Sequence, residues 1–240
     1  MTSALLPSAA TFDPAAFAAD GIAVVAGVLS PADASAARLA AAAVYAEVGP
    51  ARAGVRDPLG RSAELSRIAA LPAVINLAAT ALGRPAMLVR AILFDKTPDA
   101  NWDVVWHQDV TIAVEARHEV AGFGPWSTKL GIPHVQPPAE VLAGMVTLRL
   151  HLDDCGEANG PLLAVPGSHR RGIVDVRALD PAACDAAAVA CVAVAGDAVV
   201  MRPLALHASR KADSPHHRRV LHLEFTGSPL PEPLRWRAES

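Results

Sequence analysis

Apolar residues follow two different patterns along the chain, and the change falls near residue 86. Before this point the chain holds long alanine-rich stretches, which predict helices. After it, short apolar runs are separated by turn-forming Gly, Pro, Asn and Asp residues, which predicts strands. We therefore expect a single domain over 1–240, with a mostly helical flank (1–85), a β-rich core (86–226) and a C-terminal tail (227–240).

The helical flank carries recognisable helix ends. The stretch 30–49 begins with Ser30, a good N-cap, and has Pro31 at the first helical position. A second stretch, 62–83, predicts one or two helices that are interrupted near its internal proline and end at a glycine. The short run "GIAVVAGVL" (21–29) predicts a strand before the first of these helices.

Strands are predicted in six runs of the core, several of which alternate apolar and polar residues with a period of two. In "VTLRLHL" the valine and the leucines face one way, whereas Thr147, Arg149 and His151 face the other. Many short strands separated by turns predict a β-sandwich or barrel with the helices packed outside it. The six runs are 86–94, 104–114, 145–154, 161–169, 189–201 and 218–225.

Residues 115–140 fit neither pattern. The segment is rich in Pro and Gly, and a loop of such length in a compact domain is either disordered or functional. Phe123 and Trp126 argue against simple disorder. We expect this segment to line a substrate pocket together with 50–62 and 86–96.

Composition and charge narrow the class of protein. The net charge of −3 gives no electrostatic case for a nucleic acid or an anionic membrane as partner. The cysteines number 3 and form no CxxC, so neither a disulfide framework nor a zinc knuckle is indicated. No secretory signal or long uncharged apolar segment is evident. We expect a cytoplasmic protein that acts on a small molecule, and the oligomeric state stays open.

His107 and Asp109, in "WHQD", are candidate metal ligands. Residues two apart on a strand project from the same face, so both side chains could bind one ion. The same spacing recurs at His151 and Asp153, so the pair alone is not diagnostic. His207 is the best candidate for a third ligand. The rival pair lies on a predicted strand with the turn-forming "DDCGEANG" just after it, which favours a cosubstrate-facing or core polar position and a turn as its roles.

Two histidines and one carboxylate with open coordination positions form the facial triad of non-haem Fe(II) oxygenases. The pair Arg218 and Arg219 follows His207, and a guanidinium there could bind a carboxylate in two-point fashion. With "NGPLLAVPGSH" (159–169) and "AGDAVVM" (195–201) in the same order, the chain resembles the phytanoyl-CoA dioxygenase-like family of Fe(II)/2-oxoglutarate oxygenases over more than half its length.

The resemblance implies a double-stranded β-helix (cupin-like jelly roll), mainly β with flanking helices, and the use of Fe(II), 2-oxoglutarate and O₂. It implies that His107, Asp109 and His207 hold the iron. It also implies that Arg218, helped by Ser209, binds the C5 carboxylate of 2-oxoglutarate. Arg218 is preferred to its neighbour because family members use the arginine eleven positions after the distal histidine.

Four further residues are candidates for cosubstrate contact: Lys96, Trp126, Thr147 and Arg149. Some relatives use a lysine near the position of Lys96, and the alternative is an exposed turn lysine. Trp126 could instead be ordinary packing. Thr147 and Arg149 share the face that could point into the barrel, and a structural ion pair is the alternative for Arg149.

Side-chain direction and charge add two further expectations. Trp106 and Gln108 lie on the strand face opposite the proposed ligands and should point away from the metal. The basic residues Arg56, Arg61 and Arg90 favour a carboxylated or otherwise anionic small molecule as the substrate.

The leading function is a dioxygenase that hydroxylates an unactivated C–H bond of a small molecule and releases succinate and CO₂. The resemblance favours hydroxylation over halogenation, because Asp109 stands where a halogenase has a small residue. Two alternatives stay open, a cupin-like isomerase or hydrolase that does not use 2-oxoglutarate, and a non-catalytic binding domain of the same fold.

Overall fold

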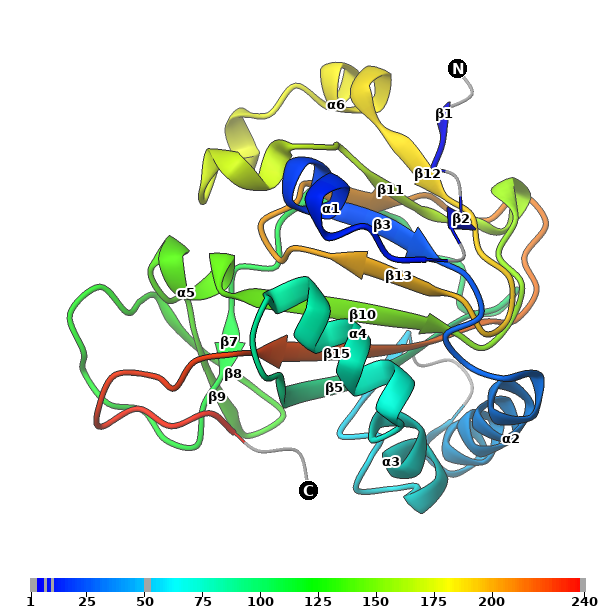
Figure 1. The fold of residues 1–240 in the computed structure, drawn as a ribbon, viewed down its shortest axis with the longest axis horizontal. Coiled ribbons are helices and arrows are strands. Elements are labelled where there is room, and N and C mark those ends of the chain that lie inside the picture. Colours follow the sequence, from blue (N-terminus) through cyan, green and yellow to red (C-terminus); the bar gives the residue numbers. More distant parts are fainter. Residues whose placement is uncertain (1–3, 7, 10, 50–52, 238–240) are drawn as a thin grey trace.

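The computed structural model describes residues 4–6, 8–9, 11–49 and 53–237. Its fold is the predicted one, a double-stranded β-helix that is mainly β with flanking helices. A seven-stranded sheet and a five-stranded sheet form the body, and the helices α2, α3 and α4 lie outside the larger sheet (Figure 1). A separate three-stranded sheet sits at one end, beside part of the segment that follows β15 (Figure 1).

The larger sheet has the strand order β2-β3-β13-β10-β15-β5-β4 and the smaller sheet the order β1-β12-β11-β14-β6. The third sheet has the order β7-β9-β8. The strands of the larger sheet are β2 (Ser8–Ala9), β3 (Ile22–Val25), β4 (Gly54–Arg56), β5 (Met87–Lys96), β10 (Met145–His151), β13 (Ala198–Met201) and β15 (Arg218–Thr226). The strands of the smaller sheet are β1 (Ala4–Leu5), β6 (Val104–His107), β11 (Leu162–Ala164), β12 (Val189–Cys191) and β14 (His207–Ser209). Those of the third sheet are β7 (Ile112–Ala113), β8 (Trp126–Lys129) and β9 (Ile132–Val135).

The predicted helices form with the expected ends. In α2 (Pro31–Val48) the Ser30 hydroxyl accepts from the backbone N–H of Asp33, a cap worth about 1 kcal/mol. The stretch 62–83 divides at its proline into α3 (Ala63–Ala69) and α4 (Pro72–Leu82). No single helix in the described ranges is long and apolar enough to cross a membrane, although the pair α3 and α4, bent by 44°, meets that test by length and composition. Three short helices were not predicted: α1 (Pro14–Asp20), α5 (Ala139–Ala143) and α6 (Pro181–Ala187).

The alternation in β10 gives the larger sheet its two faces. Leu148 and Leu150 are fully buried on the outer face, in one core with residues of α2, α3 and α4. Burying each such leucine contributes about 1.5–3 kcal/mol, so this side of the sheet holds the helices in place. Arg149 and His151 therefore point to the inner face, between the two sheets, as the period of two predicted.

Several predicted runs divide where the chain turns from one sheet to another. The run 104–114 gives β6 and β7 in different sheets, and 189–201 gives β12 and β13. The second break is at Gly196, which has φ +99°. A Cβ atom there would lie 2.9 Å from the Leu29 carbonyl oxygen, so both the backbone conformation and the close approach exclude larger residues.

Two segments that looked irregular are ordered. Within 115–140 the strands β8 and β9 form a hairpin, so the description of that whole segment as a loop was wrong. The C-terminal segment is not a free tail either, because Leu230, Leu234 and Trp236 are buried in a second apolar cluster. Neither feature has a strong local signal, since both depend on partners far away in the sequence.

Candidate metal centre

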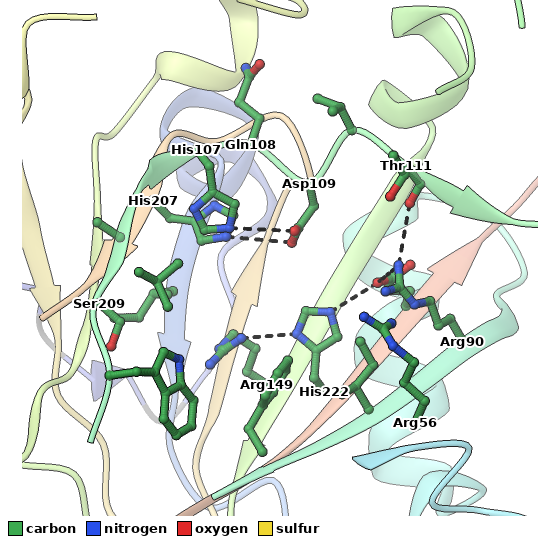
Figure 2. Close-up of a pocket in the computed structure, with 18 of the residues that line it drawn as sticks. Arg56, Arg90, His107, Gln108, Asp109, Thr111, Arg149, His207, Ser209 and His222 are labelled. Atoms are coloured by element: carbon green, nitrogen blue, oxygen red, sulfur yellow. Dashed lines mark hydrogen bonds and ion pairs between the residues drawn. The ribbon is translucent and has the colours of Figure 1, made fainter. Parts of the chain in front are cut away.

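His107, Asp109 and His207 converge in the structure. Their potential ligand atoms all lie within 4.8 Å of one another, and they are the one such group of His, Cys, Asp and Glu in the described part of the chain. The Asp109 carboxylate lies 3.9 Å from Nε2 of His107 and 3.6 Å from Nε2 of His207. Figure 2 shows both imidazoles turned toward this carboxylate. This is the donor set of a 2-His-1-carboxylate centre.

Strand pairing brings the two histidines together. His107 ends β6, His207 begins β14, and the two residues are directly paired across these antiparallel strands. Asp109 lies beyond the end of β6, so the expectation that it shares a strand face with His107 was wrong. Its backbone N–H donates to the Pro203 carbonyl oxygen at 2.9 Å, which fixes the chain just after the strand. The carboxylate reaches the site from this turn.

Backbone contacts set the tautomer of both imidazoles. Nδ1 of His107 lies 2.9 Å from the Val105 carbonyl oxygen, and Nδ1 of His207 lies 2.9 Å from that of Ala205. A carbonyl oxygen can only accept, so Nδ1 carries the proton in each ring and Nε2 presents its lone pair to the site. Such a fixed tautomer is typical of histidines that bind metals.

Electrostatics favour the protonation states that a metal requires. Burial would raise the pKa of Asp109, but the nearby His207, His222 and His107 outweigh it and the pKa is lowered. Burial lowers the pKa of His207, with Asp109 acting in the opposite direction. The carboxylate is therefore charged and the imidazole neutral near pH 7, which are the forms that bind a divalent metal.

The three side chains line the wall of a cavity of about 440 Å³, a volume typical of small-molecule sites. Gln108 also borders this cavity, yet its amide turns from the triad and bonds to the carbonyl oxygens of Gly172 and Leu204 (Figure 2). Trp106 packs in an apolar cluster and donates to Asp185. The two residues thus point away from the candidate ligands, as expected.

The inner face of the larger sheet forms the floor of the cavity. Strand register aligns Arg149, His222, Ile92 and Arg56 in one row across β10, β15, β5 and β4. Arg149 donates to Nδ1 of His222 at 3.1 Å, so the His222 proton sits on Nε2 and is donated to Glu224 at 3.2 Å. These contacts run across the floor below the triad (Figure 2).

Arg149 and Arg218 lie at the inner end of the cavity without a carboxylate partner. Neither guanidinium forms an ion pair with any residue of the described ranges, and Nε of each is buried without a hydrogen bond. The structural ion pair considered for Arg149 is therefore absent among those residues. Two buried cations without counter-charge are costly, so this end of the cavity is built for an anion.

Ser209 and Lys96 support the Arg218 side chain. The Ser209 hydroxyl accepts from Arg218 and from Lys96, each at 3.2 Å, and donates to the Gly160 carbonyl oxygen at 3.1 Å. The Gly160 carbonyl also accepts from Arg218. Gly160 has φ +60°, and a Cβ there would lie 2.6 Å from the Arg210 carbonyl oxygen. The Asn-Gly turn thus lets the backbone approach this polar cluster closely.

The alternative for Lys96, an exposed turn lysine, was wrong because the side chain is fully buried. Lys96 lies behind Ser209 and does not line the cavity. Thr147 is buried on the inner face with no hydrogen bond to its hydroxyl and does not line the cavity either. Trp126 lies elsewhere, in a shallow hollow where Arg117 stacks over its ring at 5.4 Å. None of these three residues lines the wall of the cavity.

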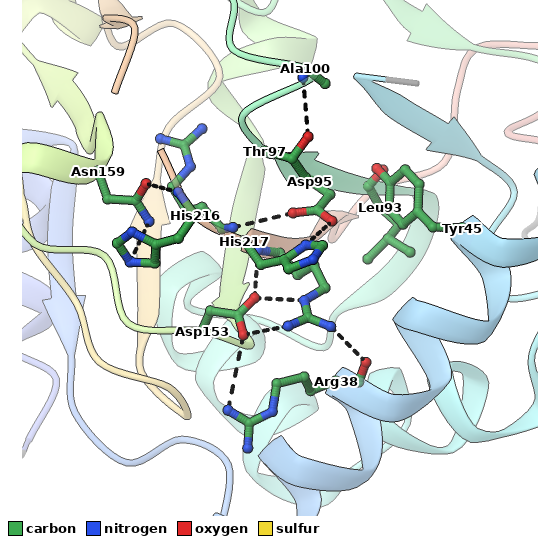
Figure 3. Close-up of polar contacts among 12 residues, drawn as sticks. Arg38, Tyr45, Leu93, Asp95, Thr97, Ala100, Asp153, Asn159, His216 and His217 are labelled. Carbon is green, nitrogen blue, oxygen red and sulfur yellow. Dashed lines mark hydrogen bonds and ion pairs between the residues drawn. The ribbon is translucent and has the colours of Figure 1, made fainter. Parts of the chain in front are cut away.

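The rival pair His151 and Asp153 is divided between two environments. His151 lies inside the barrel, and burial lowers its pKa to about 3. Asp153 accepts two hydrogen bonds from the Arg219 guanidinium, at 2.7 and 2.8 Å, and lies 4.0 Å from Arg38. Figure 3 shows Asp153 with Arg38 beside α2. This cluster holds the helix against the sheet and does not contribute to the cavity.

The sequence did not single out Lys129, His222 and Glu224 as cavity residues, although it did predict that the segment 115–140, which contains Lys129, lines a pocket. The alternation of "RRVLHLEF" carried a signal for two of them, because Arg218, His222 and Glu224 are polar residues at even spacing on one face of a strand. Lys129 had no comparable signal, since only the hairpin of β8 and β9 brings it to the cavity.

Comparison with known proteins places this site in a family. The sequence profile described as "Phytanoyl-CoA dioxygenase (PhyH)" matches residues 17–220. No curated protein shows significant similarity to the chain. The solved structures similar in fold include the epimerase SnoN from nogalamycin biosynthesis, in complex with Fe³⁺, alpha ketoglutarate and nogalamycin RO. It has a TM-score of 0.71 and 19% identity, over 95% of this chain and 85% of that chain.

Two further solved structures share the fold. EctD from S. alaskensis, with 2-oxoglutarate and 5-hydroxyectoine, has a TM-score of 0.67 and 20% identity, over 98% of this chain and 91% of that chain. The carbocyclase SnoK from nogalamycin biosynthesis has a TM-score of 0.69 and 18% identity, over 93% of this chain and 85% of that chain. These likenesses show the fold, and the profile match shows the family. The chain belongs to the phytanoyl-CoA dioxygenase family, whose members depend on Fe(II), 2-oxoglutarate and O₂.

Proposed function

We propose that this protein hydroxylates an unactivated C–H bond of a small, anionic molecule and releases succinate and CO₂. The observation that carries the proposal is the triad His107, Asp109 and His207 facing one cavity with Arg218 at its inner end. Fe(II) bound by such a triad has open positions for a 2-oxo acid and O₂ and supplies the oxidation of the C–H bond.

The protein residues have separable roles in this proposal. Nε2 of His107, Nε2 of His207 and the Asp109 carboxylate hold the iron. Arg218 binds the distal carboxylate of 2-oxoglutarate, and Ser209 fixes the direction of the guanidinium. Arg149 adds a second positive charge at the same end of the cavity.

Family membership disfavours the two alternatives left open by the sequence, a metalloenzyme without 2-oxoglutarate and a non-catalytic domain. Family membership does not decide among the oxidative outcomes, because the structures similar in fold include an epimerase, SnoN, and a carbocyclase, SnoK. The complete carboxylate-bearing triad disfavours halogenation, and among the remaining outcomes we propose hydroxylation. The mass of the product distinguishes these reactions, because hydroxylation adds one oxygen atom, ring closure removes two hydrogens and epimerisation changes neither.

The test is anaerobic loading with Fe(II), addition of 2-oxoglutarate and air, and measurement of succinate. Wild-type protein should form succinate, and His107→Ala should not. A His118→Ala variant is the matched control, because His118 is exposed and does not line the cavity. Equal succinate formation by wild type and His107→Ala would falsify the assignment of the iron site.

A further inference from the structure

Three basic side chains gather at the outer end of the cavity, away from Arg218. Arg56 comes from β4, Arg90 from β5 and Lys129 from β8, and all three line the wall. Arg90 lies two residues from Ile92, which is paired with Arg56 across the strands, so both arginines project from the same face. Figure 2 shows Arg56 and Arg90 side by side at the end of the floor.

One carboxylate faces these cations, and it is already engaged. Glu224 lies 3.1 Å from Arg90 and accepts a hydrogen bond from His222. Lys129 donates to the Thr111 hydroxyl, which is neutral, at 3.2 Å. Arg90 is therefore compensated, whereas Lys129 has a neutral hydroxyl as its hydrogen-bond partner, and the Asp109 and Glu224 carboxylates act on its ammonium only from beyond ion-pair distance.

Arg56 has no such neutral partner for its buried Nη1 atom. Nη1 is buried with no hydrogen bond, and the side chain forms no ion pair with any residue in the described part of the chain. Burial lowers the pKa of Arg56, and the neighbouring charge of Arg90 lowers it further, with Glu224 acting in the opposite direction. Burial lowers the pKa of Lys129 as well, with Arg90 and Arg56 adding to the effect and Asp109 and Glu224 acting in the opposite direction. An anion between these groups would relieve both the lost hydration and the mutual repulsion.

We infer that Arg56 and Lys129 form a subsite for an oxoanion of the substrate, a carboxylate or a phosphate. This inference rests on the proposed function, since it places the substrate between the iron and the outer end of the cavity. The anionic end of the substrate then lies at Arg56 and Lys129, and the carbon to be oxidised lies toward Asp109. The cavity of about 440 Å³ must hold the cosubstrate as well, so the substrate is small.

Two other arginines lie away from this subsite and serve as comparisons. Arg61, a candidate from the sequence, pairs with Glu47 at 2.7 Å on the surface and does not line the cavity. Arg218 lines the opposite end and is assigned to 2-oxoglutarate. The subsite is thus distinct in space from the cosubstrate anchor, and variants can separate the two.

The test uses benzoate and its uncharged counterpart benzamide as probes, with inorganic phosphate as a third. Each is titrated calorimetrically into protein loaded anaerobically with Fe(II) and 2-oxoglutarate, so that the Arg218 end is filled. Benzoate should bind, and benzamide should bind at least about tenfold more weakly, because one charge-assisted hydrogen bond contributes that much. Arg56→Gln and Lys129→Gln should each weaken benzoate binding by at least about tenfold and leave the Kd of 2-oxoglutarate unchanged.

Arg61→Gln is the matched control and should bind benzoate like the wild type. Arg56→Lys keeps the charge and should retain part of the affinity, which separates a lost contact from a folding defect. Phosphate binding tighter than benzoate, with the same dependence on Arg56, identifies a phosphate ester, and the reverse order identifies a carboxylic acid. Unchanged benzoate affinity in both glutamine variants, or no binding of benzoate and phosphate to the wild type, overturns the subsite.

Failure of the proposed function gives a different result. In that case the wild type loaded with Fe(II) does not bind 2-oxoglutarate, whereas benzoate titrated into the protein without either additive still depends on Arg56. The two hypotheses are thus tested separately in the same set of proteins.

Discussion

Arg218 and Arg219 are adjacent in the chain, yet their guanidinium groups lie on opposite faces of β15. Arg218 lines the cavity, whereas Arg219 bonds to Asp153 on the outer side. Successive residues of a strand point to opposite faces, so only one of the two can reach a cosubstrate. The register that decides between them comes from the pairing of Arg218 with Lys96 across β15 and β5.

The first prediction concerns this pair. Arg218→Gln should raise the KM for 2-oxoglutarate by at least about 30-fold, because losing one partner of a buried charge pair costs about 2 kcal/mol or more. Arg218→Lys should recover part of this loss. Succinate formation at varied 2-oxoglutarate gives the values.

Arg219→Gln should behave differently. It leaves the Asp153 carboxylate with the backbone N–H of residue 219 and, as its cation, the more distant Arg38, so the free energy of unfolding should fall by about 2 kcal/mol while the KM for 2-oxoglutarate stays unchanged. Urea titration measures the first quantity and the succinate assay the second. An effect of Arg219→Gln on KM equal to that of Arg218→Gln would contradict the assignment.

The second prediction concerns pH and Lys96. Burial and the charge of Arg218 together lower the pKa of Lys96 to about 8, although Asp103 and Cys155 act in the opposite direction. Below this pH the ammonium is charged and adds to the positive potential at the Arg218 end. Above it the charge is lost, so the KM for 2-oxoglutarate should rise as pH increases through about 8.

The matched variant is Lys96→Met, which keeps the length of the side chain and removes its charge. In this variant the KM should already be raised at pH 7, and its rise near pH 8 should disappear. Steady-state kinetics between about pH 6.5 and about pH 9, which bracket the lowered pKa of Lys96, give both profiles. A rise of the same size in wild type and variant would show that another group titrates.

The sequence predicts more of the site than of the fold around it. The order of "WHQD", His207 and the arginine pair was enough to select the triad, although Asp109 turned out to follow β6 rather than to lie on it. The strand pattern alone could not decide between Arg218 and Arg219, because a shift of one residue in register exchanges the two faces of a strand, and the preference for Arg218 came from the spacing that the family resemblance implies.

Other features had no local signal. Lys129 reaches the cavity because Trp126–Lys129 pairs with Ile132–Val135, and irregular Pro- and Gly-rich sequence does not reveal such a hairpin. Trp236 is buried by residues that lie about a hundred positions earlier in the chain, such as Ile112 and Phe123. Contacts of this kind are decided by the whole fold and not by the pattern of any one segment.

The third prediction separates the two His-x-Asp pairs. His107→Ala removes one of three proposed ligands and should weaken Fe(II) binding by more than about 100-fold, since changes to supporting residues alone cost up to that much. His151→Ala should leave the Kd of Fe(II) unchanged, because this imidazole is buried within the barrel away from the triad. Anaerobic calorimetry with Fe(II) measures both. Equal losses in the two variants would point to a general disturbance of the barrel.

The last prediction concerns the C-terminal segment. The Trp236 side chain is buried in the apolar cluster with Leu230 and Leu234, and its indole N–H donates to the Ser228 carbonyl oxygen at 2.9 Å. Trp236→Ala should therefore lower the free energy of unfolding by about 3–5 kcal/mol, measured by urea titration. Trp236→Phe keeps most of the ring contacts and loses the hydrogen bond, so its cost should be about 1 kcal/mol.

Substitutions of Trp236 should lower the stability of the fold without changing the binding of Fe(II) or 2-oxoglutarate. Trp236 does not line the cavity, so Trp236→Phe should bind Fe(II) and 2-oxoglutarate with the affinities of the wild type. Val105→Ala is a suitable surface control, because the Val105 side chain is 72% exposed and should cost less than about 0.5 kcal/mol. A Trp236→Ala variant as stable as the wild type would mean that the packing of the segment after β15 does not stabilise the fold.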